Sequence, residues 1–238
     1  MLVTPGMPTS NRTEINARTT SEFLREFKLQ LAINASFFSP FREETPWDYY
    51  PRSGDRARVA GQAISNGYGY SQPRSGWPVV CFSASNRAQI VASGKCPKGT
   101  VQAVAGDSML VAQGKPVGVG LSPKEVPYAR TAVAIDPKGE KLWLIAIDGK
   151  QPLYSEGVTM SELTKIVMEL GAHTALNLDG GGSTTLVTAT PSAPTLLNVP
   201  IQAKLPMRER PVANHLGFYA LPPNLGRADL LPIEKFGE

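Results

Sequence analysis

The sequence predicts a mixed α/β protein: one domain over residues 1–238, built on a large mixed β-sheet with flanking helices. Three observations support this fold class. Gly (22 residues) and Pro (21 residues) are too frequent for a helical bundle and favour short strands and ordered loops. Hydrophobic residues make up 42% of the chain, which is enough for a core. A strand–helix–strand pattern covers residues 142–178.

The first third of the chain predicts few regular elements. Residues 2–3 and 31–33 are apolar and predict strands. Residues 21–29 predict a short helix, because the hydroxyl-rich run 19–22 supplies an N-cap ahead of apolar positions. Residues 39–78 are rich in Pro, Gly, Arg and aromatic residues and have no periodicity. They predict a long ordered loop or an insertion with a few short strands.

Short apolar segments broken by Gly and Asn predict a meandering sheet in the middle of the chain. These segments are residues 79–82, 89–92, 102–104 and 109–111. Residues 132–135 and 142–147 flank the sequence Asp-Pro-Lys-Gly at 136–139, whose composition is typical of a type I turn, so they predict a hairpin. A final strand is predicted at residues 212–221.

The strand–helix–strand unit is the clearest pattern in the chain. Residues 142–147 are almost continuously apolar and predict a strand buried on both faces. A capping box at 159–162 precedes apolar residues spaced on one helical face, which predicts a helix over 161–170 that stops at Gly171. Residues 174–178 predict the second strand.

This unit brings two carboxylates to one edge of the sheet. A crossover through a helix normally joins strands that run in the same direction. Asp148 follows the first strand and Asp179 follows the second. We therefore expect both side chains at the carboxyl edge, where open α/β sheets bind ligands.

Composition and charge exclude several classes of partner. The formal net charge is +4, but no run of Lys and Arg interleaves with aromatic residues, so nucleic acid is not a predicted partner. No apolar run approaches the roughly 18 residues of a membrane span. The first residues, Met1 to Pro5, do not begin a signal peptide. A targeting segment could lie outside this sequence, so the compartment stays unknown and an extracytoplasmic location stays open.

Cysteine and histidine predict no metal centre. With two Cys and two His in the chain, a zinc site is not expected. No cofactor is predicted, although a single Ca²⁺ or Mg²⁺ ion remains compatible with the sequence. Cys81 and Cys96 could form a local disulfide or remain two free thiols. His215 lies in an apolar segment and is predicted to be a structural histidine.

A glycine-rich run follows the second strand of the unit. The run is Asn177-Leu178-Asp179-Gly180-Gly181-Gly182-Ser183-Thr184. Three glycines permit positive φ angles and close approach of the backbone, and successive amides there can bind an anion. The spacing of a nucleotide-binding P-loop is absent. The alternative is a tight turn without a ligand.

Several segments, in the same order, resemble motifs of the phosphodiester glycosidase family, which includes the animal uncovering enzyme. Residues 177–184 are similar to its Asn-Leu-Asp-Gly-Gly-Gly-Ser motif. The other similar segments are residues 33–38 (Asn-Gly-x-Phe-Phe in the family), 128–132 (Pro-Arg-Thr-Ala), 148–149 (Asp-Gly-Arg), 155–159 (Ser-x-Gly-x-Thr) and 210–214 (Arg-x-Val-x-Asn). The likeness is weakest over residues 39–100. Ala35, Ala129 and Lys150 depart from the family's usual Gly, Pro and Arg, which leaves the substrate open.

The resemblance implies a mixed α/β fold with a large sheet and a hydrolase that cleaves glycosyl phosphodiesters, so the expected partner is a small molecule or glycan that bears phosphate. The predicted catalytic residues are Asp179, Asp148 and Arg130, whose planar guanidinium suits a phosphate. The predicted substrate-binding residues are Asn34, Asn177, Gly180, Gly181, Gly182, Ser183, Thr184, Arg210 and Asn214.

The predicted roles of the catalytic residues depend on the fact that the leaving group is a phosphate. Glycoside hydrolysis usually requires two carboxylates. A phosphate monoester has a second pKa of about 6, so its departure needs little help from a general acid, and arginines or loop amides become more useful. Asp179 is then the base or nucleophile and Asp148 its partner. Two alternatives stay open: a module that binds a sugar phosphate or cell-wall glycan without turnover, and metal-dependent phosphodiester hydrolysis at the same two carboxylates.

Overall fold

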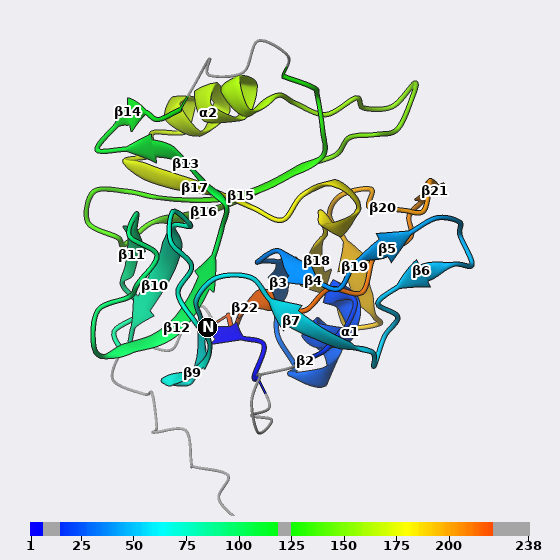
Figure 1. Ribbon diagram of the computed structural model, residues 1–238, viewed down its shortest axis with the longest axis horizontal. Coiled ribbons are helices and arrows are strands. Elements are labelled where there is room, and N and C mark those ends of the chain that lie inside the picture. The colour runs from blue at the N-terminus through cyan, green and yellow to red at the C-terminus, as the bar shows by residue number, and fades with distance from the viewer. Residues whose placement is uncertain (7–14, 119–124, 221–238) are drawn as a thin grey trace, which may run out of the picture.

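The computed structural model describes residues 1–6, 15–118 and 125–220, and this part of the chain is mainly β. It holds two α-helices, and most of its strands belong to three five-stranded sheets (Figure 1). Every strand pairing between the described residues is antiparallel. The predicted balanced α/β fold with one large mixed sheet is therefore wrong. The short segments between Gly and Pro close into hairpins, and hairpins give antiparallel pairs.

The sheet that carries the strand–helix–strand unit has the order β14-β13-β17-β15-β16. Its strands are β13 (Ser108–Ala112), β14 (Lys115–Pro116), β15 (Arg130–Ile135), β16 (Leu142–Ile147) and β17 (Thr174–Leu178). The predicted hairpin is confirmed, since β15 pairs with β16 from Arg130–Ile147 to Ile135–Leu142. Both β16 and β17 are antiparallel to β15, so they run in the same direction, as predicted, with β15 between them.

Strand β16 forms the edge of this sheet; both of its faces are packed, as predicted, but only Ile145 is fully buried. Leu144 packs against the central core and Trp143 packs on the opposite face of the sheet, yet both are partly exposed. The continuous apolar run reflects two covered faces. These residues are partly exposed because β16 lies at the edge of the sheet. The pattern of apolar residues along a strand does not show whether that strand is central or at an edge.

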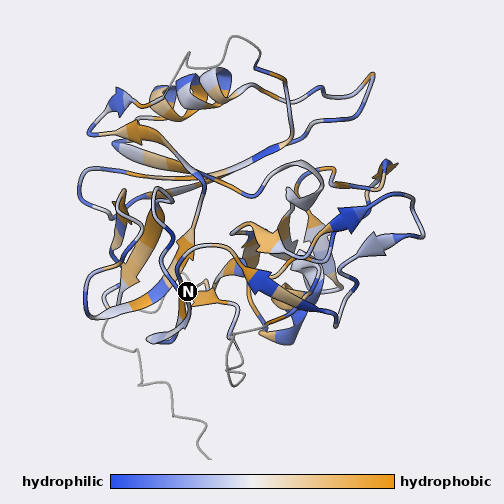
Figure 2. Cartoon of the chain, in the orientation of Figure 1, coloured by the Kyte–Doolittle hydropathy of each residue, from blue (hydrophilic) through white to orange (hydrophobic). Residues whose placement is uncertain are grey.

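Helix α2 (Met160–Glu169) covers the outer face of the same sheet. The predicted capping box is confirmed: Glu162 N donates to Thr159 Oγ1 (3.1 Å), and Thr159 N donates to Glu162 Oε2 (2.8 Å). Leu163 and Val167 are buried against the sheet. Figure 2 shows the alternation of polar and apolar residues along this helix.

The second sheet has the order β1-β22-β3-β18-β19 and is covered by α1 (Thr20–Glu26), which begins with a capping box at Thr19. Its strands are β1 (Leu2–Val3), β3 (Leu31–Asn34), β18 (Leu186–Ala189), β19 (Pro194–Leu196) and β22 (His215–Phe218). The final strand is thus shorter than predicted, and Leu221 lies outside the described residues. His215 is buried, stacks on Phe23 and lies 3.1 Å from the Thr4 hydroxyl, which confirms its structural role.

The third sheet has the order β11-β10-β12-β8-β9. Its strands are β8 (Ala63–Ser65), β9 (Tyr68–Ser71), β10 (Val79–Ser83), β11 (Ala88–Val91) and β12 (Thr100–Ala105). Cys81 on β10 and Cys96 after β11 form a disulfide, which settles the alternative left open by the sequence.

Short hairpins and loops complete the fold around the predicted insertion at residues 39–78. They include β2 (Ile15–Asn16), β4 (Phe38–Ser39), β5 (Arg42–Glu43), β6 (Tyr49–Tyr50), β7 (Arg56–Val59), β20 (Ile201–Gln202), β21 (Leu205–Pro206) and the 3₁₀ turn η1 (Gly181–Ser183). The insertion therefore contains short strands. No helix in the described part of the chain is long and apolar enough to cross a membrane.

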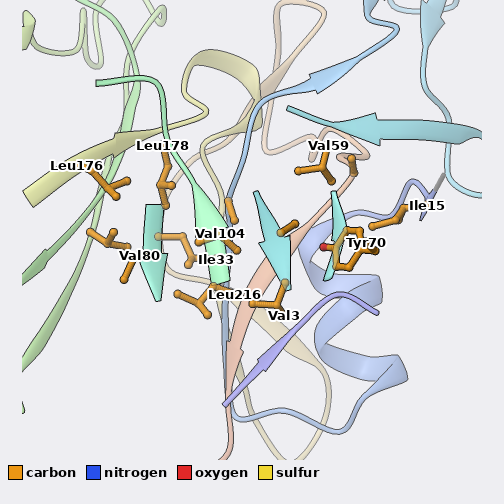
Figure 3. Packing of buried hydrophobic residues seen from close by; sticks show 14 of the residues in the cluster. Val3, Ile15, Ile33, Val59, Tyr70, Val80, Val104, Leu176, Leu178 and Leu216 are labelled. Carbon is orange, nitrogen blue, oxygen red and sulfur yellow. The ribbon is translucent and has the colours of Figure 1, made fainter. Parts of the chain in front are cut away.

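The central core lies where the three sheets meet. Figure 3 shows Val80 and Val104 from the third sheet beside Ile33 and Leu216 from the second and Leu176 from the first. Burial of these side chains against one another holds the ends of β3, β15 and β17 together. The cavity described below lies at the end of β17.

Candidate active site

A cavity of about 280 Å³ opens at the end of β17. It is lined by Phe37, Phe38, Phe41, Asp107, Tyr128, Arg130, Asn177, Asp179, Gly180, Ser183 and Arg210. Two carboxylates, two guanidinium groups and several aromatic rings therefore share one small space. Six of the predicted site residues contribute to this lining: Arg130, Asn177, Asp179, Gly180, Ser183 and Arg210.

Asp179 follows β17 directly, and its backbone is held on both sides. Its N–H donates to Ala35 O (2.9 Å), and Asn34 Nδ2 donates to its carbonyl oxygen (2.6 Å). Burial raises the pKa of its carboxyl to about 7, and the negative charge of Asp107 acts in the same direction. Hydrogen bonds from Ser183 and Gly180 and the charge of Arg210 lower that pKa only in part. Asp179 is therefore suited to exchange a proton near neutral pH.

Asp107 is the second carboxylate of the cavity, and sequence reasoning missed it. It lies in the tight turn between β12 and β13, and β13 begins beside the end of β17 because Ser108 pairs with Asn177. Asn177 Nδ2 donates to Asp107 Oδ1 (2.9 Å), and Asp107 N donates to the Asn177 carbonyl (3.2 Å). The sequence shows that Asp107 lies just before an apolar segment predicted to be a strand. It does not show that this strand pairs with β17.

Asp148 lies at the same edge of the sheet as Asp179 but does not line the cavity. Its carboxylate accepts hydrogen bonds from Asn198 Nδ2 (2.8 Å), Val199 N (3.0 Å) and Tyr154 OH (3.2 Å). Strand β15 separates β16 from β17, so the two carboxylates follow strands that are not adjacent. The carboxylate that lines the cavity together with that of Asp179 is the one of Asp107.

The glycine run does not present a set of free amides. Gly181 N donates to Ala129 O (2.8 Å), Ser183 N to Gly180 O (3.2 Å) and Thr184 N to Gly181 O (3.1 Å). These amides are satisfied within the protein, because the run tightens into the 3₁₀ turn η1. Three amides of the predicted anion-binding run are therefore occupied within the protein, and anion binding by this run stays a prediction.

The glycines are needed because each approaches another group closely. A Cβ at Gly180 would lie 2.6 Å from Ala129 O, and one at Gly181 would lie 2.6 Å from the Tyr128 ring, at a φ of +62°. A Cβ at Gly182 would overlap the Arg210 guanidinium. The run thus lets Tyr128 and Arg210 close the cavity wall.

Arg130 is half-buried in the cavity, and two backbone carbonyl groups hold its guanidinium. Its Nε donates to Val158 O (3.1 Å) and its Nη2 to Val126 O (3.4 Å). Burial lowers the pKa of Arg130, and the nearby charge of Asp107 offsets this only in part. An anionic ligand in the cavity would therefore stabilise the Arg130 cation.

Arg210 braces the wall of the cavity. Its guanidinium forms an ion pair with Glu43 and donates to Gln202 Oε1 (2.6 Å) and Ser183 Oγ (3.3 Å). Only 8% of its surface is exposed. Three of its five N–H donors bond these partners, so it holds the glycine run against β5 and β20.

Two predicted substrate-binding asparagines are fully buried behind the cavity. Asn34 Oδ1 accepts from Thr185 N (3.0 Å) and Thr131 Oγ1 (3.1 Å), and the latter hydroxyl also bonds Thr184. Asn214 Oδ1 accepts from Ser36 N (2.8 Å). Because neither asparagine is exposed, both position the backbone around the site.

The described residues hold no group of three or more His, Cys, Asp or Glu side chains placed to bind a metal ion. The carboxylates that line the cavity are Asp107 and Asp179, with two arginines beside them. This arrangement suits proton transfer and recognition of an anion.

The family model of phosphodiester glycosidases matches residues 27–219, which include the whole cavity. The chain belongs to the phosphodiester glycosidase family. The match extends from the end of α1 to beyond β22, so it covers the residues that line the cavity on all sides. No curated protein matches the chain.

Solved structures share the fold of this family member. The catalytic domain of zebrafish N-acetylglucosamine-1-phosphodiester alpha-N-acetylglucosaminidase, auto-inhibited by its pro-peptide, is 19% identical with a TM-score of 0.61, over 86% of this chain and 68% of that one. A hypothetical protein from Synechocystis is 16% identical with a TM-score of 0.57, over 90% of this chain and 56% of that one. A protein from Burkholderia pseudomallei K96243 is 14% identical with a TM-score of 0.62, over 92% of this chain and 71% of that one.

Proposed function

We propose that the chain hydrolyses a glycosyl phosphodiester in this cavity, with Asp179 as general base. One observation carries the proposal: the pKa of Asp179 is raised to about 7 in a cavity that also holds Asp107 and a half-buried arginine. A base is most effective when its pKa lies near the working pH. The family of the chain supports the same class of reaction.

In the proposed reaction, the ionised Asp179 takes a proton from water. The water oxygen forms a bond to the anomeric carbon as the bond from that carbon to the phosphate oxygen breaks. The bonding electron pair leaves with the phosphate oxygen, which converts the monoanionic diester into a dianionic monoester. The products are the free sugar, the phosphate monoester and protonated Asp179, which then releases its proton to solvent.

Arg130 stabilises the charge that develops on the departing phosphate. Its Nε and one Nη are held by two carbonyl groups, so the guanidinium is oriented before the substrate arrives. Asp107 carries the second negative charge, close to the positive charge expected on the sugar in the transition state. Asp107 thus has the role of the second carboxylate, which was predicted for Asp148.

Asn177 and the aromatic rings recognise the sugar. Asn177 Oδ1 is buried at the cavity and has no hydrogen-bond partner among the described residues. A sugar hydroxyl that donates to it would remove the cost of this unsatisfied acceptor. Phe37, Phe41 and Tyr128 offer apolar surfaces for the faces of the sugar ring.

The pH dependence of turnover tests the role of Asp179. Aryl glycosyl phosphodiesters supply a coloured product, and kcat/KM should rise with pH up to about 7 and then level off. Asp179→Asn should lose about 10²- to 10⁴-fold in kcat/KM together with that rise. A profile that falls above pH 7 would instead make Asp179 a general acid. Tight binding of sugar phosphates without turnover of any diester would favour the binding-module alternative.

A further inference from the structure

A second groove, of about 730 Å³, lies next to the cavity and has no role in the reaction described above. Its walls include Pro152 and Tyr154 from the loop after β16, and Ile201 and Pro206 from the hairpin β20–β21. Lys150 and Lys204 are the cations that line it. The groove therefore combines apolar walls with positive charge.

Two side-chain pairs form the boundary between the second groove and the cavity. Glu43 lines the groove and forms an ion pair with Arg210, which lines the cavity. Lys150 lines the groove, and its Nζ donates to the hydroxyl of Tyr128 (3.2 Å), which lines the cavity. The linings of the cavity and of the groove are therefore in direct contact at these two pairs.

Asp148 holds the walls of the second groove together. Its carboxylate binds Asn198 and Val199, just before β20, and also accepts from Tyr154 OH in the opposite wall. Gln151 Nε2 adds a bond to Val199 O (2.7 Å). The carboxylate that the sequence assigned to catalysis thus joins the two loops that form the groove.

The backbone of these two loops is bent in ways that non-glycine residues rarely adopt. Lys150 (φ 59°), Leu153 (φ 69°), Ala203 (φ 51°), Lys204 (φ 63°) and Met207 (φ 59°) all have left-handed conformations. Each costs free energy and persists only where the surroundings impose it. Leu153 and Met207, in the same two loops, are also exposed apolar side chains.

We propose that the second groove binds the alcohol portion of the phosphodiester, and that this portion is an apolar chain or ring. The proposal rests on the proposed function, which places the sugar in the cavity. The phosphate then lies between Arg130 in the cavity and Lys150 at the boundary, since both cations lie near the Tyr128 ring. The apolar alcohol lies against Tyr154 and Ile201. Lys150 at the phosphate end, Glu43 neutralised by its ion pair with Arg210, and the apolar walls beyond them match the charge distribution of such an amphiphile.

Binding of alkyl phosphates tests the groove without any need for turnover. Hexyl phosphate should bind the wild-type chain at least tenfold more tightly than methyl phosphate in calorimetry, because each methylene group buried in the groove makes the free energy of binding more favourable. Tyr154→Ser should remove most of that preference. Tyr68→Ser is the matched control, because Tyr68 is a similarly exposed tyrosine on β9, outside the groove. Thermal melts verify that both variants are folded.

Equal affinity for the two phosphates, or an equal loss of preference in Tyr154→Ser and Tyr68→Ser, would overturn the proposal. Two glycosyl phosphodiesters with the same sugar, one a methyl and one a hexyl ester, separate it from the proposed function. If both are cleaved with equal kcat/KM, the groove assignment fails and the hydrolase stands. If neither is cleaved but hexyl phosphate binds as expected, the hydrolase fails and the groove stands. A preference for the hexyl diester that Tyr154→Ser abolishes supports both.

Discussion

Replacing Asp179 by Asn should stabilise the protein at neutral and alkaline pH while it lowers kcat/KM about 10²- to 10⁴-fold. The pKa of this carboxyl is raised from 3.8 to about 7 by burial, so its ionised form is unfavourable in the folded state. Asn keeps the size and polarity of the side chain but carries no charge. The stabilisation is therefore a direct measure of the cost of holding an ionisable group in this cavity.

The magnitude follows from the shift in pKa. One pKa unit corresponds to about 1.4 kcal/mol, so a shift of roughly three units costs the wild type about 4 kcal/mol at pH 8. Between pH 4 and 7 the folded state keeps a proton that the unfolded state has lost, so wild-type stability falls as pH rises through this window. At pH 5 the cost is below about 2 kcal/mol, and below pH 3.8 it vanishes.

Thermal melts of wild type and Asp179→Asn between pH 5 and pH 8 provide the assay. For a chain of this size, 1 kcal/mol corresponds to about 2–4 °C in Tm, so the variant's advantage should grow by several degrees over this range. Asp136→Asn is the control. Hydrogen bonds from the Lys141 and Glu140 amides lower the pKa of Asp136, so this carboxyl is ionised in the folded and the unfolded state alike above pH 5, and its variant should be less stable than wild type by an amount that does not change between pH 5 and pH 8. A difference between Asp179→Asn and wild type that does not change with pH would refute the raised pKa.

Three further outcomes are expected. Arg130→Lys should lower kcat/KM on glycosyl phosphodiesters at least tenfold with little change in Tm, since Lys keeps the charge but loses the oriented guanidinium; unchanged kcat/KM would remove Arg130 from the mechanism. Burial lowers the pKa of His215 from 6.5 to about 3, so wild type should lose up to about 1.4 kcal/mol per pH unit below 6.5 relative to His215→Asn, and parallel pH curves in denaturant titrations would contradict this. Replacing both Cys81 and Cys96 by Ala should cost about 3 kcal/mol in unfolding free energy, because the bond spans 15 residues; an unchanged denaturation midpoint would count against it.

Local sequence signals determined much of the chain. Both capping boxes, the hairpin turn at Asp136 and the helix that Gly171 ends depend on a few neighbouring residues, and each is present in the structure. The direction of β16 relative to β17 was also predictable, because a helix connects them. The family follows from motifs spread along the chain. The same motifs are the basis for the prediction that Asp179, within its glycine run, is a catalytic residue.

The partner of Asp179 was decided by the tertiary structure. Sequence order suggested Asp148, but β15 enters the sheet between β16 and β17, while the turn that carries Asp107 reaches β17 from the other side. The roles of the asparagines and of Arg210 depended likewise on contacts between residues far apart in the chain, such as Glu43 with Arg210. Turns and caps are determined by interactions over a few residues, so the sequence reveals them. The neighbours of a strand are selected by packing of the whole core, and no local pattern carries that information.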